Sequence, residues 1–209
     1  MILCLITVVY LYEIKEAYGR KWLKIFYHDT MTGIYFDSFS HAMFSQDPNR
    51  YSIFSLITSS FKTEGYYEFL LEYPELSGFN QWRQNNLPWQ EEKIPSQIAG
   101  GYTPISISWN SSYWGGLVRS NDYHTTVYGS ITLLDGSPGT DLWYYAIGCI
   151  NPSVHWHPNM PGPNSAVKVA RLWLRIDNVN LINKPSLPKH YLKVSFLPIL
   201  LSFVEFIIL

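Results

Sequence analysis

Two carboxylates lie in a turn-rich loop that opens directly into an aromatic segment. Asp135 begins the run Asp-Gly-Ser-Pro-Gly-Thr, and Asp141 precedes Leu142-Trp143-Tyr144-Tyr145. Carboxylate, hydroxyl and backbone carbonyl oxygens are the hard ligands that Ca²⁺ prefers. Asp135 and Asp141 are therefore candidate calcium ligands, with Ser137 between them, and calcium is the one cofactor that the sequence suggests. Turn formation by Asp-Gly, with side-chain-to-backbone hydrogen bonds, explains the same residues equally well.

Two further groups combine tryptophan with amide or small residues. Asn85 and Asn86 precede Trp89, and Trp114 stands among tyrosine and glycine. Sugars present apolar ring faces and many hydroxyls, which suit stacking on an indole and hydrogen bonding to amides. Packing in the core is the alternative for any tryptophan. The residues that we predict to bind ligand are Asn85, Asn86, Trp89, Trp114, Asp135, Asp141 and Trp143.

Two other short motifs could carry chemistry. Asn110-Ser111-Ser112 is the sole N-glycosylation sequon, and a glycan on Asn110 would crowd Trp114. His155-Trp156-His157 places two imidazoles on one side of an extended segment, a spacing that suits zinc or copper if His124 or Asp122 adds a ligand. Solvated loop histidines are the alternative interpretation.

Motifs typical of enzymes are missing from the chain. It has no Gly-x-Ser-x-Gly, no His-Glu-x-x-His and no phosphate-binding glycine loop. Glu64, Glu68, Glu72 and Glu75 could supply the carboxylate pair of a glycosidase, but Glu68 and Glu72 fall on the side of a strand that we expect to face solvent. We therefore predict a binding protein, with glycoside hydrolysis as a minor alternative.

The composition favours a single β-rich domain. Aromatic residues make up 17% of the 209 residues and charged residues only 15%, which favours strands over a charge-rich helical bundle. The formal net charge is −1, so the chain has no basic field to hold a phosphate backbone. We do not expect nucleic acid as a partner.

The two ends of the chain raise questions of targeting. Residues 1–12 are nearly all apolar, and Ala17-Tyr18-Gly19 resembles a cleavage site, so we predict a signal peptide over 1–19. An uncleaved anchor and a misplaced start are the alternatives. Residues 181–209 form a polar spacer and a hydrophobic tail, which suggests either a lipid-anchor signal or an inaccurate gene end. We expect a secreted protein that contacts membrane only if this tail is an anchor.

Hydrophobic periodicity predicts the elements of a domain over 20–180. Alternation indicates strands at 22–28, 33–36, 66–73, 103–110, 116–119, 128–133, 142–149 and 166–177. In 103–110, four alternate residues are expected to face inward: Thr103, Ile105, Ile107 and Trp109. Asp47-Pro48 followed by apolar residues every three or four positions predicts one helix over 48–60. The fold class is thus mainly β, an antiparallel, jelly-roll-like β-sandwich with one helix, in which 22–25 and 167–174 pair to close the domain.

The cysteines of the chain predict a domain without a disulfide. If 1–19 is removed, Cys4 is lost and Cys149 is the only cysteine left, so no intrachain disulfide forms. Cys149 lies in the apolar phase of a strand, and we expect a buried, inert thiol.

Several segments together resemble a module found in secreted proteins of marine and other invertebrates, often beside lectin-like or matrix-associated domains. They are Trp22-Leu23-Lys24-Ile25-Phe26, Tyr51-Ser52-Ile53, Tyr73-Pro74-Glu75-Leu76, Asn80-Gln81-Trp82, Trp114-Gly115-Gly116-Leu117, Leu134-Asp135-Gly136-Ser137, Trp143-Tyr144-Tyr145-Ala146-Ile147-Gly148 and Pro161-Gly162-Pro163. The resemblance covers about residues 22–176. It implies an extracellular binding or matrix role and carries over no catalytic residue.

The function predicted from the sequence is therefore recognition of a carbohydrate or an extracellular matrix glycoprotein by loops at one end of the sandwich. The alternative of a different class is a structural matrix or adhesion protein that binds other proteins through its aromatic surface. A concave cleft with exposed aromatic and polar groups would favour the first, and a flat aromatic patch the second.

Overall fold

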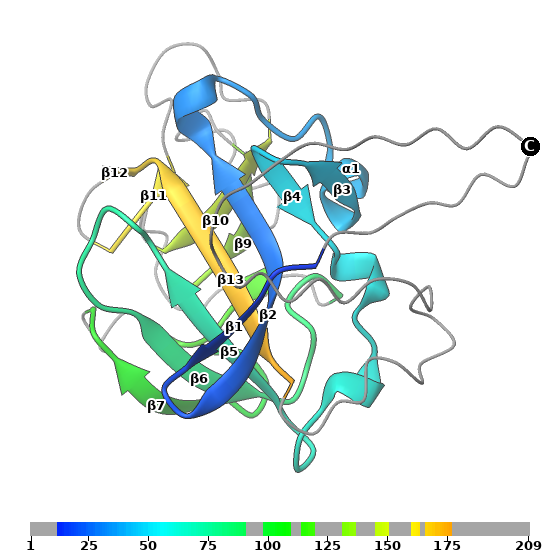
Figure 1. The fold of residues 1–209 in the computed structure, drawn as a ribbon, viewed down its shortest axis with the longest axis vertical. Coiled ribbons are helices and arrows are strands. Elements are labelled where there is room, and N and C mark those ends of the chain that lie inside the picture. Colours follow the sequence, from blue (N-terminus) through cyan, green and yellow to red (C-terminus); the bar gives the residue numbers. More distant parts are fainter. Residues whose placement is uncertain are drawn as a thin grey trace, which may run out of the picture.

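The computed structural model describes residues 12–90, 98–109, 114–119, 131–136, 145–150, 160–163 and 166–176. They form a mainly β, sandwich-like fold with one large antiparallel sheet and smaller sheets beside it (Figure 1). This confirms the predicted fold class. Among the described residues, no helix has the length and apolar character that a membrane crossing requires.

The large sheet has the strand order β3-β4-β2-β13-β5-β6-β7, and β1 pairs with residues 20–23 at the start of β2. Its strands are β1 (Ile14–Ala17), β2 (Arg20–Asp29), β3 (Ser45–Asp47), β4 (Arg50–Ser52), β5 (Tyr67–Glu72), β6 (Asn80–Gln84), β7 (Thr103–Ile107) and β13 (Val169–Arg175). A second sheet contains β8 (Val118–Arg119), β9 (Ile131–Asp135) and β10 (Ala146–Ile150), and a third contains β11 (Met160–Pro161) and β12 (Ala166–Val167). The helical segments are α1 (Phe39–Met43) and the 3₁₀ turns η1 (Thr30–Thr32), η2 (Phe54–Leu56) and η3 (Ser59–Phe61).

The centre of the large sheet joins strands from opposite ends of the described chain. β2 and β13 pair antiparallel, with Leu23 opposite Leu174 and Phe26 opposite Leu172. These side chains are fully or almost fully buried, because alternate residues of both strands face the same core. The pairing predicted between 22–25 and 167–174 is confirmed.

The inner face of the large sheet packs on an aromatic core. Tyr67, Phe69 and Leu71 of β5 point inward, as the alternation predicted, and all three are buried. Phe26 of β2 stacks on Phe54 at 5.2 Å between ring centroids. Each fully buried large apolar side chain contributes roughly 1.5–3 kcal/mol, so this face supplies much of the stability of the fold.

The outer face of the same sheet is also covered, contrary to expectation. Glu68 of β5 was expected in solvent, but only 3% of it is exposed. Trp22, Leu70 and Trp173 form a second apolar cluster beside it, with Ala17 and Phe79 packed against them. The β1–β2 hairpin lies across this face, in front of β13 and β5 (Figure 1). Solvent exposure was the wrong prediction because strand alternation cannot show that a hairpin folds over the second face.

The helix predicted over 48–60 is wrong. Asp47 and Arg50 face each other across a hairpin between β3 and β4, and the Asp47 carboxylate accepts a hydrogen bond from the backbone N–H of Asn49 (2.8 Å). Asp-Pro starts a turn as readily as it starts a helix. The spaced apolar residues nevertheless do enter the core: Tyr51, Phe54, Ile57 and Phe61 are all buried. The one α-helix among the described residues is α1, which Ser38 caps through the backbone N–H of His41.

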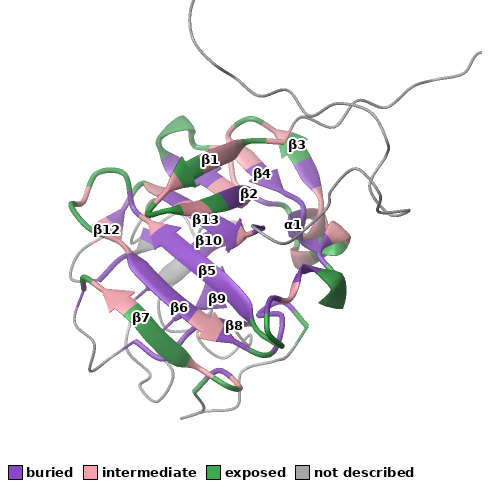
Figure 2. Ribbon diagram, turned by 60° about the horizontal axis from the view of Figure 1, so that its bottom comes forward, coloured by how far each residue is buried: buried purple, intermediate pink, exposed green. Residues whose placement is uncertain are grey.

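The alternation predicted for 103–110 is observed only in part: Trp109 is buried and Ile107 packs against the core. Thr103 and Ile105 are exposed, Ile105 by 41%, although both were expected to face inward. β7 is the edge strand of the large sheet, and its register with β6 shifts between Gln81 and Trp82. Figure 2 shows β7 largely exposed beside β6, which is mostly buried. An edge strand leaves the core at its end, so apolar spacing there does not guarantee burial.

A buried histidine connects the two main sheets. His28 of β2 donates from Nε2 to the carbonyl oxygen of Ile34 (3.0 Å), and its Nδ1 accepts from the backbone N–H of Cys149 on β10 (3.2 Å). Burial lowers the pKa of His28 to about 4, because a charged imidazole would lack hydration at this position. Its protonated Nδ1 could also no longer accept the hydrogen bond from Cys149. Cys149 is buried as predicted, and burial raises the pKa of its thiol to about 12.

Removing β1 should destabilise the fold. A chain that begins at Arg20 loses the Lys15–Glu72 ion pair (2.6 Å) and the hydrogen bond from the Trp22 indole to the Ala17 carbonyl oxygen (3.0 Å). It also uncovers the outer apolar cluster. We expect the free energy of unfolding to fall by at least about 2 kcal/mol relative to a chain that begins at Tyr12. Urea unfolding of the two chains measures the difference, and equal midpoints would show that β1 adds no stability.

Acid should weaken the fold through His28. Because the folded pKa of about 4 lies below the ordinary value of 6.5, the unfolded chain binds the proton first, and stability is lost as pH falls from 6.5 towards 4. The expected loss from His28 is about 2 kcal/mol between about pH 7 and about pH 5. Urea unfolding at both pH values tests this. His28→Gln should be less stable at neutral pH but should show a flatter pH dependence, whereas an unchanged dependence would contradict the assignment.

Candidate functional site

The predicted residues around Trp89 divide between surface and core. Asn85 is exposed, whereas Asn86 is buried and its side-chain oxygen accepts a hydrogen bond from Gln84 Nε2 (3.0 Å). Trp89 is 2% exposed and its indole stacks on Phe54, with centroids 4.2 Å apart. Trp89 therefore offers no ring face on which a sugar could stack.

Trp114 is likewise part of the core. It is 4% exposed, and its indole meets Trp82 edge-on at 4.8 Å and Tyr145 at 5.2 Å. A Cβ placed on Gly136 would lie 2.1 Å from the Trp114 ring. The glycine of the Asp135-Gly136 pair thus makes room for an indole, which is the packing alternative to a ligand-binding tryptophan.

The structure describes Asp135, but the rest of its predicted calcium site lies outside the described residues. It is 7% exposed at the end of β9, opposite Ala146 of β10 and Val118 of β8. Its charge helps to raise the pKa of Tyr73, after burial and Tyr145. Asp141, Trp143, Ser137 and the sequon at Asn110 lie outside the described residues, as do the histidines at 155 and 157. Calcium binding therefore stays a prediction, and within the described ranges no three metal-ligating side chains gather.

Gln84 was missed by the sequence analysis and connects β6 to the segment before β8. Its Oε1 accepts from the Trp82 indole (2.7 Å) and from the backbone N–H of Leu117 (3.0 Å). Its Nε2 donates to the Leu117 carbonyl oxygen (3.0 Å) and to Asn86. An amide can satisfy both of its ends when buried, so this role is structural. The sequence feature that could have indicated this role is that Gln84 lies two residues after Trp82, on the same face of β6.

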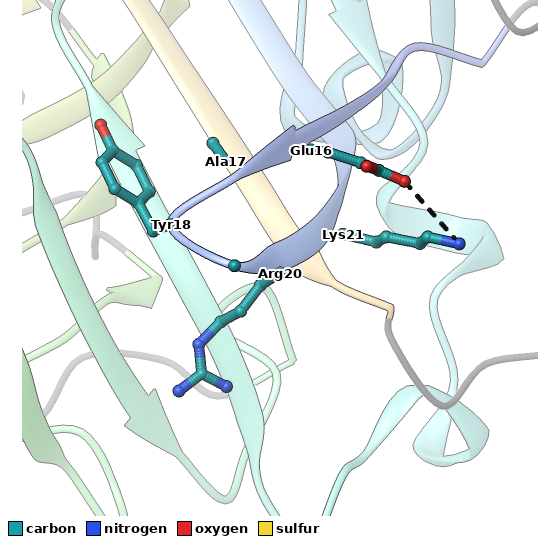
Figure 3. Close-up of a pocket in the computed structure, with 6 residues that line it drawn as sticks. Glu16, Ala17, Tyr18, Arg20 and Lys21 are labelled. Atoms are coloured by element: carbon teal, nitrogen blue, oxygen red, sulfur yellow. Dashed lines mark ion pairs between the residues drawn. The ribbon is translucent and has the colours of Figure 1, made fainter.

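The described residues form a surface hollow at the tip of the β1–β2 hairpin. It measures about 610 Å³ and is lined by Glu16, Ala17, Tyr18, Gly19, Arg20 and Lys21 (Figure 3). That volume lies in the range of small-molecule sites, roughly 300–1,000 Å³. The predicted signal peptide covered most of these residues, so they were not considered as a site. Two features of the sequence could have identified this site: the charged residues of 13–16 and the alternation around Tyr18-Gly19.

Tyr18 stands at a backbone position that rarely holds an aromatic residue. Ala17 pairs with Arg20, so Tyr18 and Gly19 form the turn, with φ of 56° and 68°. A turn with positive φ at both central residues favours Asn-Gly, Asp-Gly or Gly-Gly. A tyrosine there costs on the order of 1–3 kcal/mol. Its ring is 54% exposed and lies 4.3 Å from the Phe79 ring.

Arginine side chains surround one buried carboxylate beneath the hairpin. Glu68 pairs with Arg83 Nε and Arg175 Nη1, both at 2.9 Å, and with Arg20 Nε at 3.3 Å. Its neighbour along the strand, Glu72, pairs with Lys15 and accepts from the Trp173 indole (2.7 Å). Cross-strand rows of this kind place opposite charges on one face of a sheet.

These contacts keep Glu68 ionised. Burial acts to raise its pKa, but hydrogen bonds from Arg175, Arg83 and Gln81 outweigh burial, and the pKa of Glu68 lies below its usual value. A glycosidase needs one carboxylic acid whose pKa is raised so that it can donate a proton. Glu68 has the opposite shift, and Glu72 already accepts from a cation and an indole.

The packing of Trp114 on Gly136 can be tested directly. Gly136→Ala should lower the free energy of unfolding by about 1–3 kcal/mol, because the new methyl group overlaps the indole. Chemical denaturation of Gly136→Ala, Trp114→Leu and the double variant measures the coupling. The alanine should cost much less once the indole is gone. Additive effects would show that the two residues do not touch.

Comparison with known proteins adds no assignment. No protein-family model, no curated protein sequence and no solved structure matches the chain.

Proposed function

We propose that the protein is an extracellular binding module that recognises carbohydrate through the hollow at the β1–β2 hairpin. The observation that carries this proposal is Tyr18. More than half of this aromatic residue is exposed, at a turn position where a smaller residue would be less strained. Strained, exposed side chains cluster at functional sites. The open hollow beside it has the volume of a small-ligand site.

The chemistry of the hairpin suits a sugar. One face of the Tyr18 ring rests near Phe79, which fixes its orientation, and the exposed remainder can stack on the apolar face of a pyranose. Arg20 lies two residues further on and supplies N–H donors for hydroxyl oxygens. In Figure 3 both side chains lie away from the Glu16–Lys21 pair, the Tyr18 ring above the turn and the Arg20 guanidinium below it.

Binding without catalysis is part of the proposal. The carboxylates nearest to the hollow are engaged in ion pairs: Glu16 with Lys21 (3.8 Å), Glu68 with its arginines and Glu72 with Lys15. Of these, Glu68 is a poor proton donor, because hydrogen bonds from its arginines and Gln81 outweigh burial and hold its pKa below the usual value. This supports recognition over hydrolysis.

The hairpin site and the predicted cleavage after Gly19 are mutually exclusive, because cleavage there would remove Tyr18. The proposal therefore requires that the mature protein retain β1. Intact-mass measurement of the protein recovered from the medium of secreting cells decides between them. A chain that begins at Arg20 would contradict the proposed site.

Replacing the tyrosine should separate binding from stability. Tyr18→Asn restores a favoured turn sequence, Asn-Gly, but removes the ring. We expect glycan binding to fall by about tenfold or more, because the stacking contact is lost. The thermal midpoint should change little, since relief of backbone strain offsets the lost Phe79 contact. A glycan array followed by calorimetry measures both effects.

The matched control is Tyr66→Asn, which removes another exposed tyrosine, 39% exposed, that does not line the hollow. It should bind glycans like the unaltered protein. Equal losses in the two variants, or full binding by Tyr18→Asn, would place the site elsewhere. No binding by the folded, unaltered protein would contradict the proposed function and favour a protein-binding matrix role.

A further inference from the structure

The charge balance beneath the hairpin is positive. Arg20, Arg83 and Arg175 converge on Glu68, and the only other carboxylate that pairs with this group among the described residues is Glu64, 3.5 Å from Arg83. Three guanidinium groups thus face two carboxylates. The Glu64 side chain is 74% exposed, so solvent screens its charge.

Arg20 is the member of this group that reaches the hollow. Within the described part of the chain its one ion pair is made through Nε, at 3.3 Å from Glu68. No described residue pairs with its two terminal nitrogens, and Figure 3 shows them pointing away from the hairpin strands. The Glu68 contact holds the side chain in place while its terminal donors remain available.

The geometry of these donors selects a type of ligand. A guanidinium presents parallel N–H groups that match the two oxygens of a carboxylate or a sulfate. A neutral hydroxyl uses only one of them. Glu16 projects from the other side of the hairpin with Lys21 (Figure 3). Glu72 is close enough for its charge to help raise the pKa of Tyr18, after burial, but its carboxylate is paired with Lys15.

We propose that Arg20 binds a negatively charged substituent, a carboxylate or a sulfate, on the sugar that stacks on Tyr18. The inference rests on the proposed function and narrows its ligands to acidic glycans. Arg83 and Arg175 hold Glu68, and Glu68 in turn positions Arg20. Arg20 is thus the residue that determines specificity, and Tyr18 supplies binding energy that neutral and acidic sugars share.

The test compares three soluble oligosaccharides on the full chain by calorimetry. Chondroitin carries carboxylates, chondroitin sulfate carries both groups, and a chitin oligosaccharide is neutral. We expect the acidic oligosaccharides to bind about tenfold more tightly than the neutral one, and the difference to shrink at high salt. Comparison of chondroitin with chondroitin sulfate distinguishes the carboxylate from the sulfate as the bound group.

Arg20→Gln and Lys21→Gln form a matched pair, since each removes one positive charge from neighbouring residues that face opposite sides of the hairpin. Arg20→Gln should lose the preference, so that acidic and neutral oligosaccharides bind about equally, whereas Lys21→Gln should keep both the preference and the affinities of the unaltered protein. Arg20→Lys, which retains the charge but not the paired donors, should recover only part of the preference. Thermal midpoints establish that each variant is folded.

The outcomes separate the two proposals. Equal affinity of the unaltered protein for acidic and neutral oligosaccharides, or equal losses in the two glutamine variants, would overturn the role of Arg20 and leave carbohydrate binding intact. Failure to bind any of the three oligosaccharides or any glycan on the array would contradict the proposed function, and with it this inference.

Discussion

The pairing of β2 with β13 is the constraint on which the rest of the structure depends. It joins residues near 25 to residues near 172 in the centre of the large sheet, so the core cannot close until nearly the whole described chain is present. Contacts this distant in sequence are slow to form, because the loop between them must be ordered first. Once formed, the pair provides the surface on which both the aromatic core and the β1–β2 hairpin pack.

Burial of both faces of this sheet has an electrostatic consequence. A carboxylate on the inner side of the hairpin loses its hydration, and a lone charge there would be strongly destabilising. Glu68 is instead surrounded by Arg20, Arg83, Arg175 and Gln81. The contact with Glu68 also positions the Arg20 guanidinium at the hollow. The requirement to stabilise a buried charge and the proposed recognition of an acidic ligand therefore both use Arg20.

Much of the fold could be predicted, but little of the candidate site. Alternation correctly identified the core face of β5, and the closure expected of a sandwich correctly identified the pairing of β2 with β13. The helix prediction failed at Asp47-Pro48, because a turn and a helix start share the same residues. Trp89 and Trp114 looked like loop residues beside Pro and Gly, yet both indoles fill the core. Phe54, which stacks on Trp89, is remote from it in the sequence. Nothing in the sequence marks Gly136 as the residue that contacts the Trp114 ring.

The sequence by itself determined that the protein is a mainly β domain, because alternating apolar residues can bury one side of a strand only in a sheet. It also determined which large side chains are available for a core. Only the tertiary structure decided that the hairpin folds over the second face of the sheet. That fold buries Glu68 and exposes Tyr18 beside Arg20. These positions depend on contacts between strands far apart in the chain, which no local pattern encodes.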